Sequence, residues 1–215
     1  MKFFNTDGPL YRFMNQFKDL LVFNFIWILF SLPIVTIGAS SVAACAVGMK
    51  IAKNEEGYIA RSFVKEFKKN WKQGTAVWLM MVLLGYALYL DFQILHVQAN
   101  PSVLVIIASI AAVVVFFLSF TYAFALLARY DNTVLHTIQN SYHIALHYFG
   151  RTIAMIVTLA FILLILCFNR TMLYFMIVIG PGALFYTYSS FCLQVFQKVE
   201  DDNPGSTRDV RSERK

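Results

Sequence analysis

Residues 20–49 constrain this chain most, because thirty consecutive residues carry no charge. As one straight helix they would extend about 45 Å, whereas the hydrocarbon core of a bilayer is about 30 Å thick. The stretch is therefore too long for one ordinary crossing and short for two. Ser31-Leu32-Pro33 interrupts its middle, because proline removes a backbone donor and disfavours helix at the preceding residue. Thr36 is a candidate N-cap for a new helix.

The composition is that of a membrane protein. Apolar residues make up 59% of the chain and charged residues 14%, against about 25% charged in soluble domains. The formal charge of +6 comes from lysines and arginines beside apolar segments, so the expected partner is an anionic membrane surface and not nucleic acid. Cys45, Cys167 and Cys192 lie in apolar segments without metal-ligand spacing, so we expect buried side chains. We expect no metal ion and no cofactor.

Four more apolar segments, residues 75–97, 103–127, 152–168 and 172–196, predict membrane-spanning helices. The short connectors within each pair predict two helical hairpins. The expected fold is all-α, a polytopic transmembrane helical bundle of five to six membrane segments, the first a broken or re-entrant hairpin. Residues 1–198 would form a single transmembrane domain. The polar residues 199–215 are expected to be a disordered cytoplasmic tail.

Two amphipathic segments are expected to form interfacial helices. In residues 50–72, aromatic side chains recur four apart and lysines cover the other face. The expected membrane-surface residues are Phe63, Lys65, Phe67, Lys68, Lys69 and Trp71. In residues 131–150, an apolar stripe lies opposite a polar face of His136, Asn140, His143 and His147. His143 and His147 have a spacing that zinc can use, but no HExxH glutamate accompanies them, so we expect a solvated helix face, with a metal or pH-sensing role as the alternative.

The distribution of basic residues predicts the topology. Lysine and arginine accumulate on the cytoplasmic side of membrane proteins. If residues 20–49 enter the membrane and return, the basic residues of the N-terminus, of the 50–72 and 128–151 segments and of the tail share one side. Arg170 is then the exception among the eighteen lysines and arginines. A single crossing would spread them over both sides, so we predict a returning hairpin with both termini cytoplasmic.

Two helix interruptions are candidate binding sites. They are expected at Pro33 with Gly38, and at Gly180-Pro181-Gly182. Discontinuous helices form the solute sites of many carriers, although ordinary membrane helices also kink in this way. The candidate substrate-binding residues around them are uncharged groups suited to sugars or other neutral solutes: Asn24, Trp27, Thr36, Ser40, Tyr186 and Tyr188.

Residues able to carry catalysis are not evident. The sequence shows no nucleophile–base pair, metal motif or phosphate-binding loop, so we expect a protein that is not an enzyme and assign no catalytic residue. Asp91 is the exception among nearly charge-free spans, and it lies near the outer end of its segment.

Residues 24–39, NFIWILFSLPIVTIGA, resemble the signature of the YesL-like family of bacterial integral membrane proteins, a domain of unknown function. Residues 62–73, SFVKEFKKNWKQ, are similar to a second recurring segment of that family. Genes of the family often lie beside those of binding-protein-dependent sugar importers and glycan-degrading enzymes. The resemblance thus implies a bacterial plasma-membrane protein that is a non-enzymatic accessory or regulatory component of carbohydrate uptake, with sugar-transporter subunits as partners. The alternative is a small neutral-solute transporter using the broken helices around Pro33 and Pro181.

Overall fold

The computed structural model describes residues 9–53, 55, 58–97, 102–130, 132–167 and 170–202, and all regular secondary structure in this part of the chain is helical. This confirms the all-α class. The helices are α1 (Pro9–Ser31), η1 (Ile34–Thr36), α2 (Ile37–Ala52), α3 (Ile59–Val97), α4 (Val103–Thr121), α5 (Ala123–Arg129), α6 (Val134–His147), α7 (Phe149–Cys167) and α8 (Arg170–Asp202). Residues 203–215 of the expected tail lie outside the described residues, whereas residues 199–202 continue α8.

The chain reverses between α1 and α2, as the interruption at Pro33 predicts. Pro33 has an extended backbone, with φ −75° and ψ 118°, and the short η1 turn follows it. The Thr36 hydroxyl lies 2.8 Å from the carbonyl oxygens of both Phe30 and Pro33, so it satisfies backbone groups that the break frees. Ser31 Oγ and Ser40 Oγ are 2.7 Å apart and join the two helix ends. Gly38, however, lies inside α2, so the expected break there is wrong.

Helix α2 lies at the centre of the fold, and residues 38–49 are buried without exception. Glycine, alanine and serine let neighbouring helices approach its backbone closely. A Cβ on Gly74 of α3 would lie 2.8 Å from the Cα of Ala39, and a Cβ on Gly48 would lie 2.9 Å from the Cβ of Ser189 in α8. The small residues of the first apolar segment therefore position α3 and α8.

Helix α3 runs without interruption from Ile59 to Val97. The segment expected to form an interfacial helix, residues 50–72, is not a separate element, since α2 extends to Ala52 and the remainder belongs to the long helix; its position at the membrane surface stays a prediction. Gly74, at the expected junction, stays helical because its lack of a side chain permits the contact with α2. Lys50 Nζ contacts Ser62 Oγ at 2.8 Å and Glu66 Oε1 at 3.2 Å, which fixes the start of α3 against the end of α2.

Helices α4 and α5 divide the expected span of residues 103–127 at Tyr122. The Tyr122 N–H donates to Ser141 Oγ over 3.0 Å, and the Ser141 hydroxyl donates to the Leu118 carbonyl over 3.2 Å. In an uninterrupted helix these two backbone groups would bond to each other, so the hydroxyl of α6 is inserted into the ladder. The interruption therefore arises from tertiary packing.

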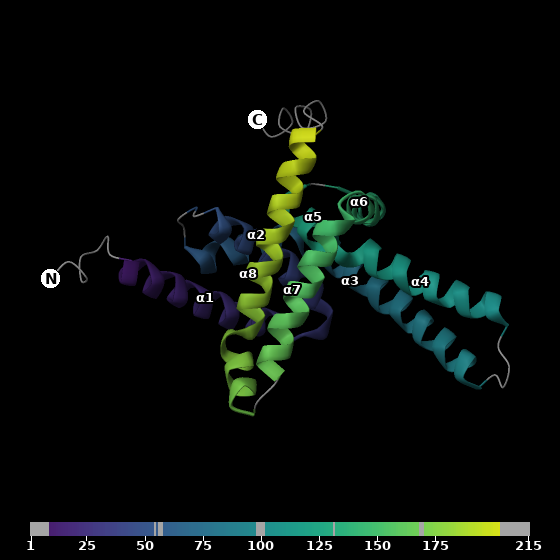
Figure 1. The fold of residues 1–215 in the computed structure, drawn as a ribbon. Coiled ribbons are helices and arrows are strands. Elements are labelled where there is room, and N and C mark those ends of the chain that lie inside the picture. Colours follow the sequence, from purple (N-terminus) through teal and green to yellow (C-terminus); the bar gives the residue numbers. More distant parts are fainter. Residues whose placement is uncertain are drawn as a thin grey trace.

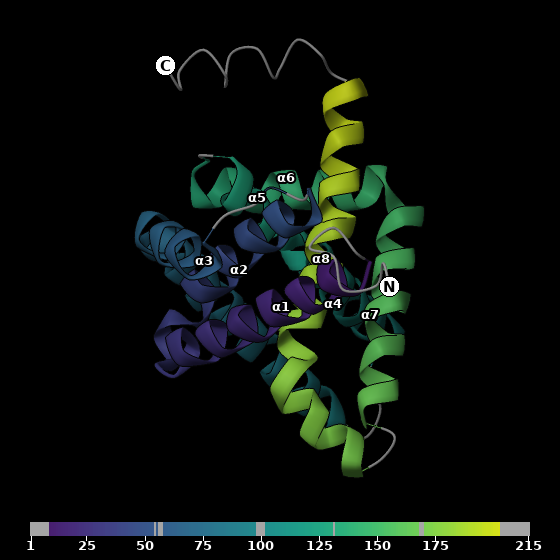
Figure 2. The same cartoon turned by 90° about the vertical axis from the view of Figure 1, so that its left-hand side faces the viewer.

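Helix α8 continues through Gly180-Pro181-Gly182, so the expected second break is wrong, although Figure 2 shows α8 changing direction along its length. Proline inside a helix frees backbone groups that neighbouring helices must satisfy. Asn24 Oδ1 of α1 accepts the N–H of Gly182 over 3.0 Å. A Cβ on Gly182 would lie 3.2 Å from the Leu20 carbonyl oxygen, so a side chain there would crowd the backbone of α1.

Three segments of the described residues are long and apolar enough to cross a membrane: Ile34–Ala52, Ile59–Val97 and Val103–Arg129. A fourth is possible if the pair Val134–His147 and Phe149–Ile165, bent by 96°, is one broken span. The structure thus agrees with a membrane protein, while the five to six segments and the interfacial position of α6 stay predictions. In Figure 1, the paired helices α3 and α4 extend to one side, and α7 and α8 form a second pair.

Candidate functional site

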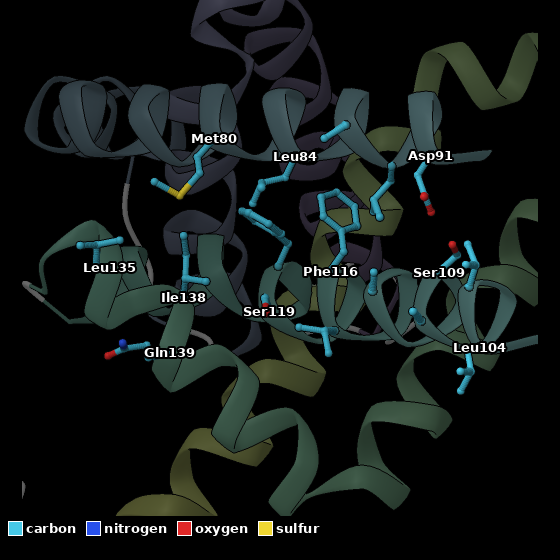
Figure 3. Close-up of a pocket in the computed structure, with 17 residues that line it drawn as sticks. Met80, Leu84, Asp91, Leu104, Ser109, Phe116, Ser119, Leu135, Ile138 and Gln139 are labelled. Carbon is cyan, nitrogen blue, oxygen red and sulfur yellow. The ribbon is translucent and has the colours of Figure 1, made fainter. Parts of the chain in front are cut away.

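An apolar groove lies between α3 and α4 and reaches α6 at one end (Figure 3). Its volume is about 770 Å³. The lining side chains are mainly aliphatic and aromatic: Met80, Leu84, Ala87, Leu88, Asp91, Leu104, Val105, Ala108, Ser109, Ala112, Val115, Phe116, Ser119, Phe120, Leu135, Ile138 and Gln139. The groove forms because α3 and α4 pack closely near Phe116 and Phe120 while the rest of the pair remains largely exposed.

The groove has polar groups toward its two ends. Asp91 and Ser109 lie at one end in Figure 3, and Gln139 of α6 lies at the other. Asp91 forms no hydrogen bond or ion pair with another described residue. A carboxylate beside apolar side chains in a membrane protein favours a positively charged neighbour or water. The groove can therefore accept an apolar occupant with a positive group beside Asp91.

The candidate substrate-binding residues near the first break bond within the protein. Asn24 is buried and accepts the Gly182 N–H, as described above. Ser40 bonds to Ser31 and donates to the Ile37 carbonyl over 3.0 Å, and both hydrogen-bond acceptors of the Thr36 hydroxyl are backbone carbonyls. These three polar groups stabilise the helix junctions that surround them.

The three remaining candidates do not complete a shared cavity. The Trp27 ring packs on Phe185, with ring centroids 5.2 Å apart, and its buried indole N–H has no partner among the described residues. The Tyr188 hydroxyl donates to the Thr121 carbonyl over 2.6 Å, at the end of α4. Tyr186 is exposed. None of the six candidate residues lines the groove between α3 and α4.

Sequence reasoning missed the buried hydroxyls beside the α4–α5 interruption. Besides Ser141, they include Tyr122, whose hydroxyl lies 3.0 Å from Thr152 Oγ1 in α7. Thr152 Oγ1 also lies within hydrogen-bond distance of the Ala145 and Tyr148 carbonyls. The available signal was the four-residue spacing of Thr137 and Ser141, which places two hydroxyls on one face of α6. These hydroxyls join α4, α6 and α7, and their partners are within the protein.

The expected membrane-surface residues divide into two groups. Phe63 is fully buried against Phe23, Ala44 and Val47, so this ring contacts protein and its assignment to the membrane surface is corrected. Phe67 is partly buried and meets the Phe30 ring at a centroid distance of 4.9 Å. The remaining members lie exposed on α3, and their contact with a membrane stays a prediction: Lys65, Lys68, Lys69 and Trp71.

Helix α8 is fastened to α5 at its C-terminal end by a charged cluster. Arg129 Nη2 donates to Glu200 Oε2 over 2.8 Å, and the Tyr130 hydroxyl donates to Glu200 Oε1 over 2.6 Å. Burial and then the hydrogen bond to Glu200 raise the pKa of Tyr130 well above its usual value. A neighbouring contact joins the Tyr148 hydroxyl to Asp202 Oδ2 at 2.6 Å.

His143 and His147 are exposed on α6, and both line a shallow cavity together with Tyr148, Val199 and Asp202. Within the described part of the chain, no group of three or more histidine, cysteine, aspartate or glutamate side chains is arranged to hold a metal ion. Two imidazoles alone do not make a structural zinc site, which uses four ligands. The alternative metal role for this face therefore gains no support.

Comparison with known proteins supports the resemblance seen in residues 24–39 and 62–73. Residues 20–92 match the family model described as "Protein of unknown function, DUF624". The chain is also 26% identical over 175 residues to "Uncharacterized protein YesL" of Bacillus subtilis (strain 168), covering 80% of this chain and 83% of the relative. No solved structure matches significantly. The family match covers α2, most of α3 and the end of α1, which together form the close-packed centre of the fold. The chain is thus similar to the DUF624 family over residues 20–92 and to YesL over most of its length.

Proposed function

We propose that this protein is a non-enzymatic accessory component of carbohydrate uptake that acts by packing against a sugar-transporter subunit. The link to carbohydrate uptake comes from the YesL-like resemblance. The observation that supports a packing role is the contrast between two regions. Three of the candidate solute-binding groups, Asn24, Thr36 and Ser40, bond inside the protein, whereas the paired helices α3 and α4 present a long apolar groove.

The carrier alternative loses its main support with the continuous path of α8. A carrier site would need freed backbone groups near Pro181 to face a solute. Instead, the Gly182 N–H donates to Asn24, and the Tyr188 hydroxyl donates to the Thr121 carbonyl. Hydrogen bonds to a neutral sugar would have to replace these internal bonds, each contributing about 0.5–1.5 kcal/mol net.

Reconstitution and co-purification together test the function. Purified protein in liposomes should not take up labelled sugars, and mild-detergent purification from native membranes should recover a membrane subunit of a sugar importer. Deleting the gene should lower uptake through that importer, and expression of the wild-type chain should restore it. Sugar uptake by the purified protein would overturn the proposal in favour of a carrier. Unchanged uptake in the deletion strain would also refute it.

We further propose a location in the bacterial plasma membrane with α6 and both termini on the cytoplasmic side. The contacts of Glu200 with Arg129 and Tyr130 support this orientation, because they bring the end of α8 to the basic 128–151 segment. In Figure 1, α5, α6 and this end of α8 lie together. A membrane-impermeant thiol reagent should label cysteine at position 102 from outside intact cells, but label cysteine at positions 55 and 140 only after permeabilisation. External labelling at position 55 would contradict the returning hairpin.

A further inference from the structure

The groove between α3 and α4 is longer than one leaflet of a bilayer. Its lining on α4 runs from Leu104 to Phe120, a distance of about 24 Å along a helix. Half of the hydrocarbon core is only about 15 Å thick. At one end Asp91 lies near the end of α3, and at the other Leu135, Ile138 and Gln139 belong to α6. A lipid chain from one leaflet would fill part of this length, whereas a membrane-spanning helix would follow all of it.

The walls of the groove permit close approach of a helix. Ala87 on α3 and Ala108 and Ala112 on α4 line it, and all three are exposed. Small side chains at membrane helix interfaces allow backbones to approach and gain packing contacts. Larger side chains, Leu84 and Phe116, stand beside them and can fit between the side chains of an occupant. This alternation of small and large residues suits the ridged surface of a helix.

The charge at Asp91 specifies the occupant further. Its carboxylate lines the groove and has no partner among the described residues. Charged groups at membrane depth pair with opposite charges or with water. A lysine or arginine on the occupant would neutralise Asp91, and Ser109 on the opposite wall could accept a further hydrogen bond from it.

We propose that this groove receives a transmembrane helix of a partner protein, with a lysine or arginine of that helix beside Asp91. The inference rests on the proposed accessory function and names the chemistry of the partner. A small-residue or leucine face of the helix would lie along Ala108 and Ala112, and its basic residue would lie near its outer end.

The test uses synthetic transmembrane peptides, because these define the occupant chemically. Full-length protein carrying a fluorophore is placed in phosphatidylcholine vesicles with acceptor-labelled leucine–alanine helices, which carry lysine, glutamine or glutamate near one end. Energy transfer measures association. The lysine peptide should associate about 3- to 15-fold more tightly than the glutamine peptide, the range expected for polar side-chain pairs between membrane helices. Asp91→Asn should abolish this preference, and Asp91→Lys should transfer it to the glutamate peptide.

Shape is tested separately from charge. Ala112→Leu should fill the groove and weaken association of both the lysine and glutamine peptides. Ala160→Leu makes the same change on an exposed position of α7, outside the groove, and should leave association unchanged. Melting temperatures of both variants, compared with wild type, show that each protein remains folded.

Several outcomes would overturn the inference. Equal association of the lysine and glutamine peptides with wild type would refute the charge pairing. Energy transfer between donor- and acceptor-labelled copies of the protein, lost in Ala112→Leu and without peptide association, would identify a second copy as the occupant. Retention of a phospholipid in native mass spectrometry by wild type but not by Ala112→Leu, without peptide association, would identify a lipid. If Asp91→Asn and Ala112→Leu co-purify with the importer subunit as well as wild type does, the groove assignment fails while the proposed function stands.

Discussion

The crossing of α2 and α3 should tolerate no side chain at Gly74. A Cβ there would lie 2.8 Å from the Cα and 3.0 Å from the N of Ala39, and both atoms belong to the backbone of a buried helix. Neither helix can yield locally, so Gly74→Ala must separate them. Overpacking of this kind costs up to about 3 kcal/mol, and the better helix propensity of alanine returns about 1 kcal/mol. The expected net loss in the free energy of unfolding is therefore about 2 kcal/mol.

Gly85→Ala provides the matched control on the same helix. A Cβ at Gly85 would meet the Cζ of Phe116 at 3.6 Å, which is ordinary van der Waals contact. The propensity gain should then dominate, and the variant should be more stable than wild type by about 0.5–1 kcal/mol.

Reversible unfolding in mixed detergent micelles, followed by circular dichroism, measures both free energies. The two variants should shift stability in opposite directions although the chemical change is identical. If Gly74→Ala matched Gly85→Ala, α2 and α3 would not cross at this point and the central role of α2 would be refuted. A smaller loss for Gly74→Ala combined with a gain for Gly85→Ala would revise the magnitude only.

Two more predictions concern the contacts of α8 with α1 and with Tyr130. Asn24→Leu should lower the free energy of unfolding by about 1–3 kcal/mol, because it leaves the buried Gly182 N–H without its acceptor. The control Phe25→Leu, on the exposed side of α1, should change this free energy by less than about 0.5 kcal/mol. Equal effects of the two variants would contradict the hydrogen bond between Asn24 and Gly182. Burial and the hydrogen bond to Glu200 raise the pKa of Tyr130, so its contribution to stability is complete below about pH 10, where the unfolded tyrosine titrates, and is lost as pH rises above that value. The decline in stability between about pH 9 and pH 11 should be smaller in Tyr130→Phe than in wild type, and parallel declines would show that Tyr130 does not contribute.

The membrane-protein class and the helix interruption at Pro33 follow from local properties of the sequence. A long charge-free stretch is apolar wherever it packs, and Pro33 restricts its own backbone and that of Leu32 in every tertiary context. These two facts suffice to predict a helical membrane protein whose chain turns within residues 20–49.

Other assignments depended on neighbours that the sequence does not reveal. The periodicity of Phe63 and Phe67 shows an apolar helix face, but the same pattern suits lipid and protein, and here α1 and α2 cover Phe63. The backbone at Gly74 and at Tyr122 likewise differs from what the local sequence predicts. Gly74 remains helical because α2 packs against it. At Tyr122 the helix is interrupted by the hydroxyl of Ser141, although the segment contains no proline or glycine.

The sequence by itself therefore determined that the chain is a membrane protein and that its backbone bends at Pro33. Both properties depend on residues that are close together in the sequence. Only the tertiary structure decided that α8 continues through Pro181 and which groups the buried polar side chains bind. Proline leaves backbone groups without their helical hydrogen bonds, and whether the helix breaks depends on whether neighbouring side chains bond to them. Asn24, distant in sequence, contributes that acceptor to Gly182. The groove beside Asp91 likewise exists because α3, α4 and α6 meet, and no single segment contains it.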